Sequence, residues 1–150
     1  MEDSSTDRVH VRRDVVAAIA AHARRESPKE CCGLLVGNAR EVCDAVETAN
    51  VAVEPNRHYQ VSPVDHFALI KRCRETSVQG SVPLEVIGVY HSHPRSAPVP
   101  SPTDRCEAFG DFLYVIVGPV GGPAPMEMRA YRLNDGEFED VALGAEPPSD

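Results

Sequence analysis

A buried strand that ends in two histidines is the most informative feature of the sequence: Val86-Ile87-Gly88-Val89-Tyr90-His91-Ser92-His93-Pro94. Its apolar, largely β-branched beginning is typical of a strand inside a sheet. Because side chains alternate across a strand, His91 and His93 lie on one face and Ser92 on the other. Gly88 allows another backbone to approach closely. The chain therefore places two imidazoles at a strand end, where binding sites commonly form.

A possible third ligand follows after seven residues, in Ser101-Pro102-Thr103-Asp104. This pattern alone predicts only the start of a helix, since Ser62-Pro63-Val64-Asp65 has it too without preceding histidines. Behind His91 and His93, however, the Asp104 carboxylate completes three of the four positions of a catalytic zinc site, with the fourth open for water. The same ligand set can also hold non-haem iron.

Hydrolysis at such a site needs a general base from elsewhere in the chain. Glu30 is the best candidate, because it stands directly before the apolar run that begins at Cys31. An acid at the start of a buried strand can face a cleft. From the residues alone, an exposed loop glutamate is the simpler interpretation.

Composition limits the class of protein. The chain has 150 residues and a net charge of −8, which fits a single globular domain and argues against nucleic-acid binding. No apolar run approaches the ~20 residues that span a bilayer, so no membrane association is expected, and we expect a soluble, cytoplasmic protein. The five cysteines contain no Cys-x-x-Cys pair, which favours a reducing compartment with buried thiols. The neighbours Cys31 and Cys32 are expected to point to opposite faces of a strand and to pack.

Hydrophobic periodicity predicts an α/β fold, a mixed and mainly antiparallel sheet flanked by two longer helices and one short helix. The helices are expected at residues 12–25, from 62 to before 80, and from 102 to about 109. The second has an apolar side made of Phe67, Leu69, Ile70 and Cys73. Strands are expected at residues 9–11, 32–37, 41–51, 84–93, 112–117, 126–133 and 138–143. Residues 1–8 and 144–150 are expected to be disordered, which leaves one domain at 9–143.

These motifs resemble those of the JAMM (MPN-plus) metallopeptidases. The family signature, His-x-His, seven residues and Ser-x-x-Asp, matches at His91, His93, Ser101 and Asp104 without a gap, and its upstream glutamate matches at Glu30. The similarity covers roughly residues 9–143 and implies the cytidine deaminase-like MPN architecture. The short build, with Asn50-Val51-Ala52, Pro55 and Tyr59, looks most like the bacterial single-domain branch that includes the Mec-type enzymes.

The resemblance implies a role for each residue of the motif. His91, His93 and Asp104 would bind Zn²⁺, Glu30 would be the acid/base, and Ser101 would hydrogen-bond the substrate carbonyl or its oxyanion. The implied reaction is hydrolysis of a peptide or isopeptide bond at the C-terminal tail of a ubiquitin-like or sulfur-carrier protein. The sequence does not distinguish an isopeptide, a linear peptide or a C-terminal cysteine adduct, and it leaves the oligomeric state open.

Three other functions are compatible with parts of the sequence. The first is a non-catalytic MPN-type interaction module, although such modules generally lack some of the ligands. The second is a zinc deaminase, whose His-x-Glu and Pro-Cys-x-x-Cys signature does not occur here. The third is a cysteine protease that pairs Cys32 with a histidine.

Overall fold

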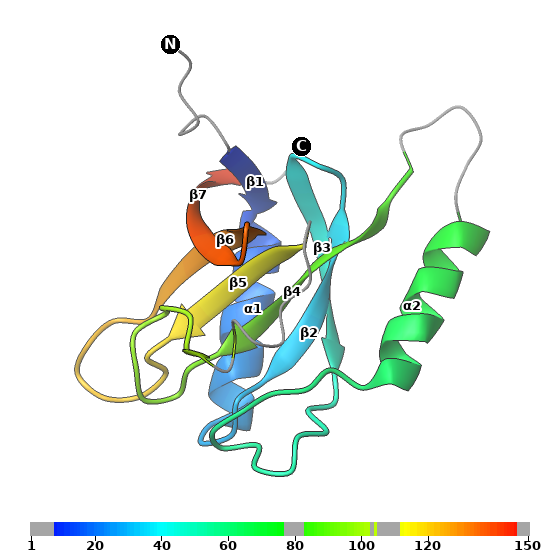
Figure 1. Cartoon of the computed structure of the whole chain (residues 1–150). Helices are drawn as coiled ribbons and strands as arrows, with labels where there is room; N and C mark the ends of the chain where they lie inside the picture. The colour runs from blue at the N-terminus through cyan, green and yellow to red at the C-terminus, as the bar shows by residue number, and fades with distance from the viewer. Residues whose placement is uncertain (1–7, 77–82, 103, 105–111, 147–150) are drawn as a thin grey trace.

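The computed structural model describes residues 8–76, 83–102, 104 and 112–146. Over these ranges the chain forms seven strands and two helices (Figure 1). In chain order they are β1 (Arg8–Arg12), α1 (Arg13–Glu26), β2 (Cys32–Gly37), β3 (Glu41–Thr48), α2 (Pro63–Glu75), β4 (Glu85–Ser92), β5 (Leu113–Gly118), β6 (Glu127–Asn134) and β7 (Glu137–Glu146). The predicted third, short helix lies mostly outside the described residues. Of its expected residues that the structure describes, Pro102 and Asp104 are helical.

The sheet is closed, with strand order β1-β3-β2-β4-β5-β6-β7 and β7 pairing back to β1. Strand β1 pairs in parallel with both β3 and β7, and β4 pairs in parallel with β5. The remaining neighbours are antiparallel. The mixed α/β class and the mainly antiparallel sheet are therefore confirmed, since four of the seven strand pairs in the described sheet are antiparallel, but closure of the sheet was not predicted. Hairpin signals join strands that are close in sequence, whereas closure pairs the two ends of the domain.

Both faces of the central strands are buried, each against a different helix. On β2, Leu35 packs into the cluster that contains Val15 and Ile19 of α1, while Leu34 packs into the cluster that contains Leu69 of α2. In Figure 1, α1 lies behind the strands and α2 stands apart at their side. All of β2 and β5 is buried, which explains why their sequences are continuous apolar runs rather than alternating ones.

Helix α2 departs from its predicted packing. Ser62 caps it as expected, with its Oγ accepting a hydrogen bond from the Asp65 N–H at 3.3 Å. Leu69 is buried and Cys73 packs against the same cluster, but Phe67 is 72% exposed. The placement of Phe67 on the apolar side is therefore wrong, because two residues of helix rotate it by about 200° from Leu69. Neither helix of the described chain is long and apolar enough to cross a membrane.

The expected disordered ends are partly strands. Strand β1 already begins at Arg8, and β7 continues to Glu146. Residues 142–146 pair with residues 8–12, so the prediction of a disordered tail is wrong for 144–146. Arg8 and residues 144–146 show no strand pattern in the sequence. They join the sheet because residues 8–12 and 142–146 hydrogen-bond to each other. The other residues predicted to be disordered lie outside the described ranges.

Candidate metal centre

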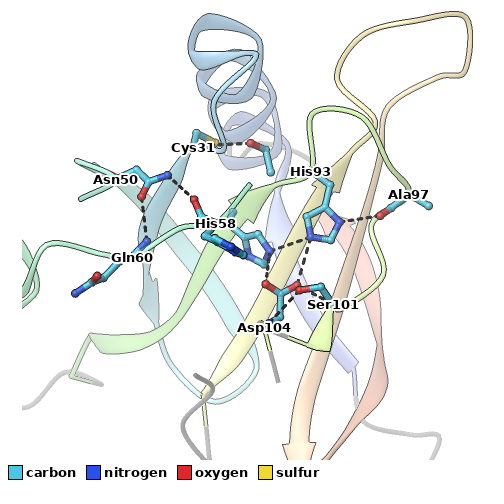
Figure 2. A network of polar contacts seen from close by, with 10 residues as sticks. Cys31, Asn50, His58, Gln60, His93, Ala97, Ser101 and Asp104 are labelled. Carbon is cyan, nitrogen blue, oxygen red and sulfur yellow. Dashed lines mark hydrogen bonds and ion pairs between the residues drawn. The ribbon is translucent and has the colours of Figure 1, made fainter. Parts of the chain in front are cut away.

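Three side chains converge where β4 ends (Figure 2). His91 lies near the end of β4, His93 follows its last residue, and Asp104 comes from the helical turn beyond the proline-rich loop. The Nε2 atoms of the two histidines are 3.2 Å apart. Asp104 Oδ1 lies 3.3 Å from His91 Nε2, and Oδ2 lies 3.3 Å from His93 Nε2. The structure thus brings together the three ligands that the sequence predicts.

The donor atoms of this cluster fit a zinc ion. The two histidine nitrogens are 3.2 Å apart, and each lies 3.3 Å from an oxygen of Asp104, Oδ1 for His91 and Oδ2 for His93. Ligand atoms about 2.0–2.1 Å from zinc, with tetrahedral angles, lie roughly 3.3–3.4 Å from one another, which is close to the spacing of the two nitrogens. Two neutral nitrogens and one carboxylate oxygen also match the donor types that zinc prefers. The residues present therefore fit a zinc ion with one further position open to solvent or substrate.

Hydrogen bonds outside the cluster orient the ligand atoms. His93 Nδ1 lies 2.8 Å from the carbonyl oxygen of Ala97, which makes Nδ1 the protonated nitrogen and leaves the Nε2 lone pair directed at the cluster. Asp104 Oδ2 accepts the Ser101 N–H at 2.8 Å. Its Oδ1 is then the oxygen with fewer other partners, which suits it to bind the metal.

The electrostatics of the cluster favour the ligand forms of two groups. Burial works against ionisation of Asp104, but the hydrogen bonds from His91 and His93 outweigh it and hold the Asp104 pKa well below its ordinary value. Burial lowers the pKa of His91 despite the neighbouring carboxylate, so His91 is neutral. For His93, burial is outweighed by the hydrogen bonds to Asp104 and Ala97, which raise its pKa. An anionic oxygen and a neutral imidazole are therefore available at neutral pH.

Glu30 lies beside this cluster, opposite His93. In the antiparallel β2–β4 ladder Cys32 pairs with His91, and two hydrogen bonds between Cys31 and Ser92 carry the pairing one residue further. Continuing the register places Glu30 across from His93, on the face that carries His91. The prediction that this glutamate faces a cleft is therefore favoured over an exposed loop position.

The environment of Glu30 suits an acid/base. The residue is 8% exposed, and its buried Oε1 has no hydrogen-bond partner within the described residues. Burial is the main cause that raises its pKa to about 7, with His93 lowering it and Asp104 raising it further. A carboxyl group that titrates near neutrality can both accept and return a proton. Glu30 also borders a cavity of about 540 Å³ that lies on the side of β2 and α1.

Ser101 forms the predicted capping box with Asp104. Its Oγ accepts the Asp104 N–H at 3.0 Å, and the Asp104 carboxylate accepts the Ser101 N–H in return. A hydroxyl that accepts a hydrogen bond keeps its own proton to donate. Ser62 and Asp65 form the same cap on α2, but there the carboxylate accepts the Ala49 N–H instead. Both helix starts have the same capping pattern. Only the one at Ser101 and Asp104 is preceded by the histidines.

Two neighbours of the cluster had no role in the sequence prediction. The ring of Tyr59 stacks on His91, with centroids 4.1 Å apart and planes 17° from parallel. The side chain of Asn50 binds the backbone around both Tyr59 and Glu30. Both residues belong to the irregular segment after β3, which carries no periodic signal. Their presence in the pattern shared with the bacterial branch was the available clue.

Cys31 and Cys32 are packing residues. Cys31 belongs to the core cluster next to α1, and Cys32 lies on the opposite face, where its Sγ is 3.5 Å from Thr48 Oγ1. Burial raises the pKa of Cys31 to about 12 and that of Cys32 to about 11. Both thiols therefore stay protonated at neutral pH, which argues against a thiolate nucleophile.

Comparison with known families agrees with the geometry. Residues 12–134 match the family of prokaryotic homologs of the JAB domain. The chain belongs to this prokaryotic JAB family. The match includes both histidines, Asp104, Ser101 and Glu30.

Three named relatives resemble the chain along most of its length. It is 32% identical to a desampylase of Haloferax volcanii over 149 residues, covering 95% of this chain and 99% of that protein. It is 36% identical to a probable TtuB-protein conjugate cleaving protease of Thermus thermophilus over 135 residues, covering 90% and 81%. A CysO-cysteine peptidase of Mycobacterium tuberculosis is 34% identical over 127 residues, covering 84% and 83%. All three relatives carry names of hydrolytic enzymes or of conjugate cleavage.

Solved structures show the same JAB fold. A protein of Desulfitobacterium hafniense superposes with a TM-score of 0.79 at 23% identity, covering 93% of this chain and 94% of that one. A JAB1/MPN domain protein of Archaeoglobus fulgidus superposes with a TM-score of 0.56 at 19% identity, covering 92% and 96%. The closed sheet with two helices is therefore a form of the JAB1/MPN fold.

Proposed function

We propose that the chain is a zinc-dependent peptidase that hydrolyses a peptide or isopeptide bond at the C-terminal tail of a ubiquitin-like or sulfur-carrier protein. The observation that carries the proposal is the convergence of His91, His93 and Asp104 on one point beside the buried carboxyl group of Glu30. The names of the relatives support the choice of substrate, since they include a conjugate-cleaving protease and a CysO-cysteine peptidase.

Each residue has a distinct part in the proposed reaction. His91, His93 and Asp104 would hold the zinc ion, which would supply Lewis acidity to activate water and polarise the substrate carbonyl. Glu30 removes a proton from the attacking water and delivers it to the leaving amine. The Ser101 hydroxyl donates a hydrogen bond to the oxygen that becomes negative as water adds.

The test uses a small carrier protein that ends in Gly-Gly, prepared in three forms: joined to lysine by an isopeptide bond, extended by a linear peptide, or extended by cysteine. We expect the purified chain to bind about one zinc and to cleave at least one form after the last glycine, as seen by intact-mass spectrometry. A chelator abolishes cleavage and a thiol blocker does not. A Glu30→Gln variant keeps its zinc and loses turnover by at least about 100-fold.

The main alternative is a non-catalytic JAB-type interaction module. Isothermal titration separates the two functions, because a folded chain that binds no zinc would favour the module. Cleavage that survives chelation but stops with a thiol blocker would instead favour a cysteine protease.

A further inference from the structure

The side chain of Asn50 links the backbone of Glu30 to the segment that carries Tyr59. Figure 2 shows its contacts with His58 and Gln60. Its Nδ2 donates to the carbonyl oxygen of Glu30 at 2.9 Å and to that of His58 at 3.0 Å. Its Oδ1 accepts the Gln60 N–H at 3.0 Å. One carboxamide thus contacts the proposed acid/base and both neighbours of the tyrosine that stacks on His91.

The carboxamide of Asn50 is used to its full capacity. Oδ1 accepts a second hydrogen bond, from the Ala52 N–H at 3.0 Å, so two lone pairs and two N–H groups all have partners. Nδ2 also lies 3.5 Å from the Pro55 carbonyl oxygen, but that oxygen accepts the Glu30 N–H at the shorter distance of 2.8 Å. Donors on one side and acceptors on the other fix the orientation of the amide. Of the side chains this short, only asparagine offers two N–H donors together with an oxygen that accepts two hydrogen bonds.

Glu30 depends on this arrangement for its position. Its N–H donates to Pro55 and its carbonyl accepts from Asn50, so both backbone groups are bound to the segment after β3. Its buried Oε1, in contrast, has no hydrogen-bond partner in the described part of the chain. No hydrogen bond from the described residues orients that oxygen. The direction in which the side chain points therefore depends on the backbone hydrogen bonds that hold Glu30 in place.

The same segment holds one wall of the metal cluster. Tyr59 stands between His58 and Gln60, whose backbone groups Asn50 binds, and its ring lies 4.1 Å from that of His91. His91 is 1% exposed, and its Nδ1 has no hydrogen-bond partner among the described residues. Stacking on Tyr59 therefore restricts the tilt of this imidazole together with the contacts of its Nε2 with Asp104 and His93.

We propose that Asn50 is a positioning residue that sets the Glu30 carboxylate beside His93 and Asp104 of the metal cluster for turnover. This inference rests on the proposed function. It assigns Asn50 to the reaction through Glu30, and not to metal binding or to substrate contact. Hydrogen bonds that orient residues next to a metal site are commonly worth 10–100-fold in activity or affinity, so an effect of about that size is expected.

Two variants test the proposal. Asn50→Asp keeps the acceptor for Ala52 and Gln60 but loses both donors, whereas Asn50→Ala loses all four hydrogen bonds. We expect kcat to fall by about 10–100-fold in both, with KM within about threefold of the wild type. Zinc content stays near one per chain, and the visible spectrum of the cobalt-loaded protein reports any change at His91. The Asp variant preserves the test if the Ala variant does not fold.

A matched control comes from Asn38, which also caps a turn, accepting the N–H groups of Arg40 and Glu41 at 3.0 and 3.1 Å. Asn38→Ala removes comparable hydrogen bonds on the β2–β3 connection and is expected to leave kcat unchanged. Unchanged kcat in folded Asn50→Asp would overturn the proposal.

A double-mutant cycle separates positioning from a general structural effect. In a Glu30→Gln background, measured by single turnover with excess enzyme, Asn50→Asp is expected to cost little more, because the group through which it acts is already gone. The same fold-loss in both backgrounds would overturn the proposal. If the wild-type chain cleaves no carrier protein, the proposed function fails instead, so the two failures are distinguishable.

Discussion

Glu30 combines burial with an ionisable group that has little local support. The residue is 8% exposed, and the nearby Asp104 carboxylate adds to the cost of a second negative charge. Such a group lowers the stability of the folded chain whenever it is ionised. A site that needs a proton acceptor near neutral pH provides a reason to retain it.

The stability cost of Glu30 predicts a pH-dependent gain in the glutamine variant. Folding raises the pKa of Glu30 from 4.5 to about 7. As far as Glu30 alone is concerned, the folded chain therefore has its full stability below pH 4.5, where Glu30 is protonated, and loses stability as the pH rises from 4.5 through 7. At pH 8, metal-free Glu30→Gln is expected to unfold with a free energy up to about 3 kcal/mol higher than the wild type. Below pH 4.5 this charge-dependent difference disappears. Urea unfolding with a chelator across this pH range measures it.

An exposed glutamate provides the control. Glu75 at the end of α2 has a side chain 63% exposed, and Glu75→Gln should show no comparable dependence. A Glu30→Gln variant whose stability follows that of the wild type at every pH would mean that Glu30 is not desolvated as described.

Ser101 has two roles that substitution can separate. Loss of its hydroxyl removes a helix cap, worth about 1 kcal/mol, and in the proposed reaction also removes the oxyanion donor. Ser101→Ala is expected to lower kcat by about 100-fold or more. Ser62→Ala, which removes the equivalent cap of α2, should lose similar stability and keep its kcat. Thermal unfolding and steady-state kinetics on both variants check this, and equal kcat values for the two would contradict the role of Ser101.

At the scale of elements, β4 joins the fold to the site. It lies between β2, which leads from Glu30, and β5, with which it pairs in parallel. Its side chains alternate between the two hydrophobic clusters: Val89 packs in the cluster next to α2 and Tyr90 in the cluster next to α1. The hydroxyl of Tyr90 lies 2.7 Å from His22 Nδ1, which satisfies the polar end of a ring that is 1% exposed. A strand fixed on both faces and both edges gives the histidines a rigid base.

Close packing of β4 against β5 depends on Gly88. A Cβ atom at this position would lie 2.1 Å from the carbonyl oxygen of Leu113, and a backbone atom in a buried ladder cannot move aside. Gly88→Ala is therefore expected to cost about 3 kcal/mol or more. Gly121→Ala, where nothing lies within 4 Å, should change stability by less than about 0.5 kcal/mol. Denaturant unfolding measures both, and a Gly88→Ala chain as stable as Gly121→Ala would contradict this packing.

At the scale of the whole molecule, closure of the sheet joins the two ends of the domain. Residues 8–12 pair with 142–146, and β1 also pairs with β3. Closure gives every strand of the described sheet a neighbour on both sides, although β1 meets β3 at only two residue pairs. Fewer free strand edges mean fewer routes to aggregation.

Closure predicts different stabilities for two truncations. A chain that ends at residue 146 keeps the complete β1–β7 ladder, whereas one that ends at 143 loses the partners of His10, Val11 and Arg12. At about 0.5–1.5 kcal/mol for each net hydrogen bond, the shorter chain should be less stable by roughly 2 kcal/mol. Thermal unfolding of the two truncated proteins compares them directly. Equal melting temperatures would show that these pairs add nothing to stability.

The sequence by itself determined the local elements and the types of chemical group. Bounds of β2, β4 and α1 were predicted closely, because uniform burial and a 3.6-residue period are properties of neighbouring residues. The spacing of His91 and His93 likewise required only the alternation of a strand. The capping box fixed Asp104 relative to Ser101 by hydrogen bonds three residues apart.

Only the tertiary structure decided how these pieces meet. The pairing of residues 8–12 with 142–146, the exposure of Phe67 and the stacking of Tyr59 on His91 join segments far apart in sequence, or depend on which face another element covers. Glu30 lies near His93 and Asp104 because β2 begins beside the end of β4, where Cys32 pairs with His91. Local patterns carry no information about such contacts, because their free energy is gained only when distant surfaces are buried together.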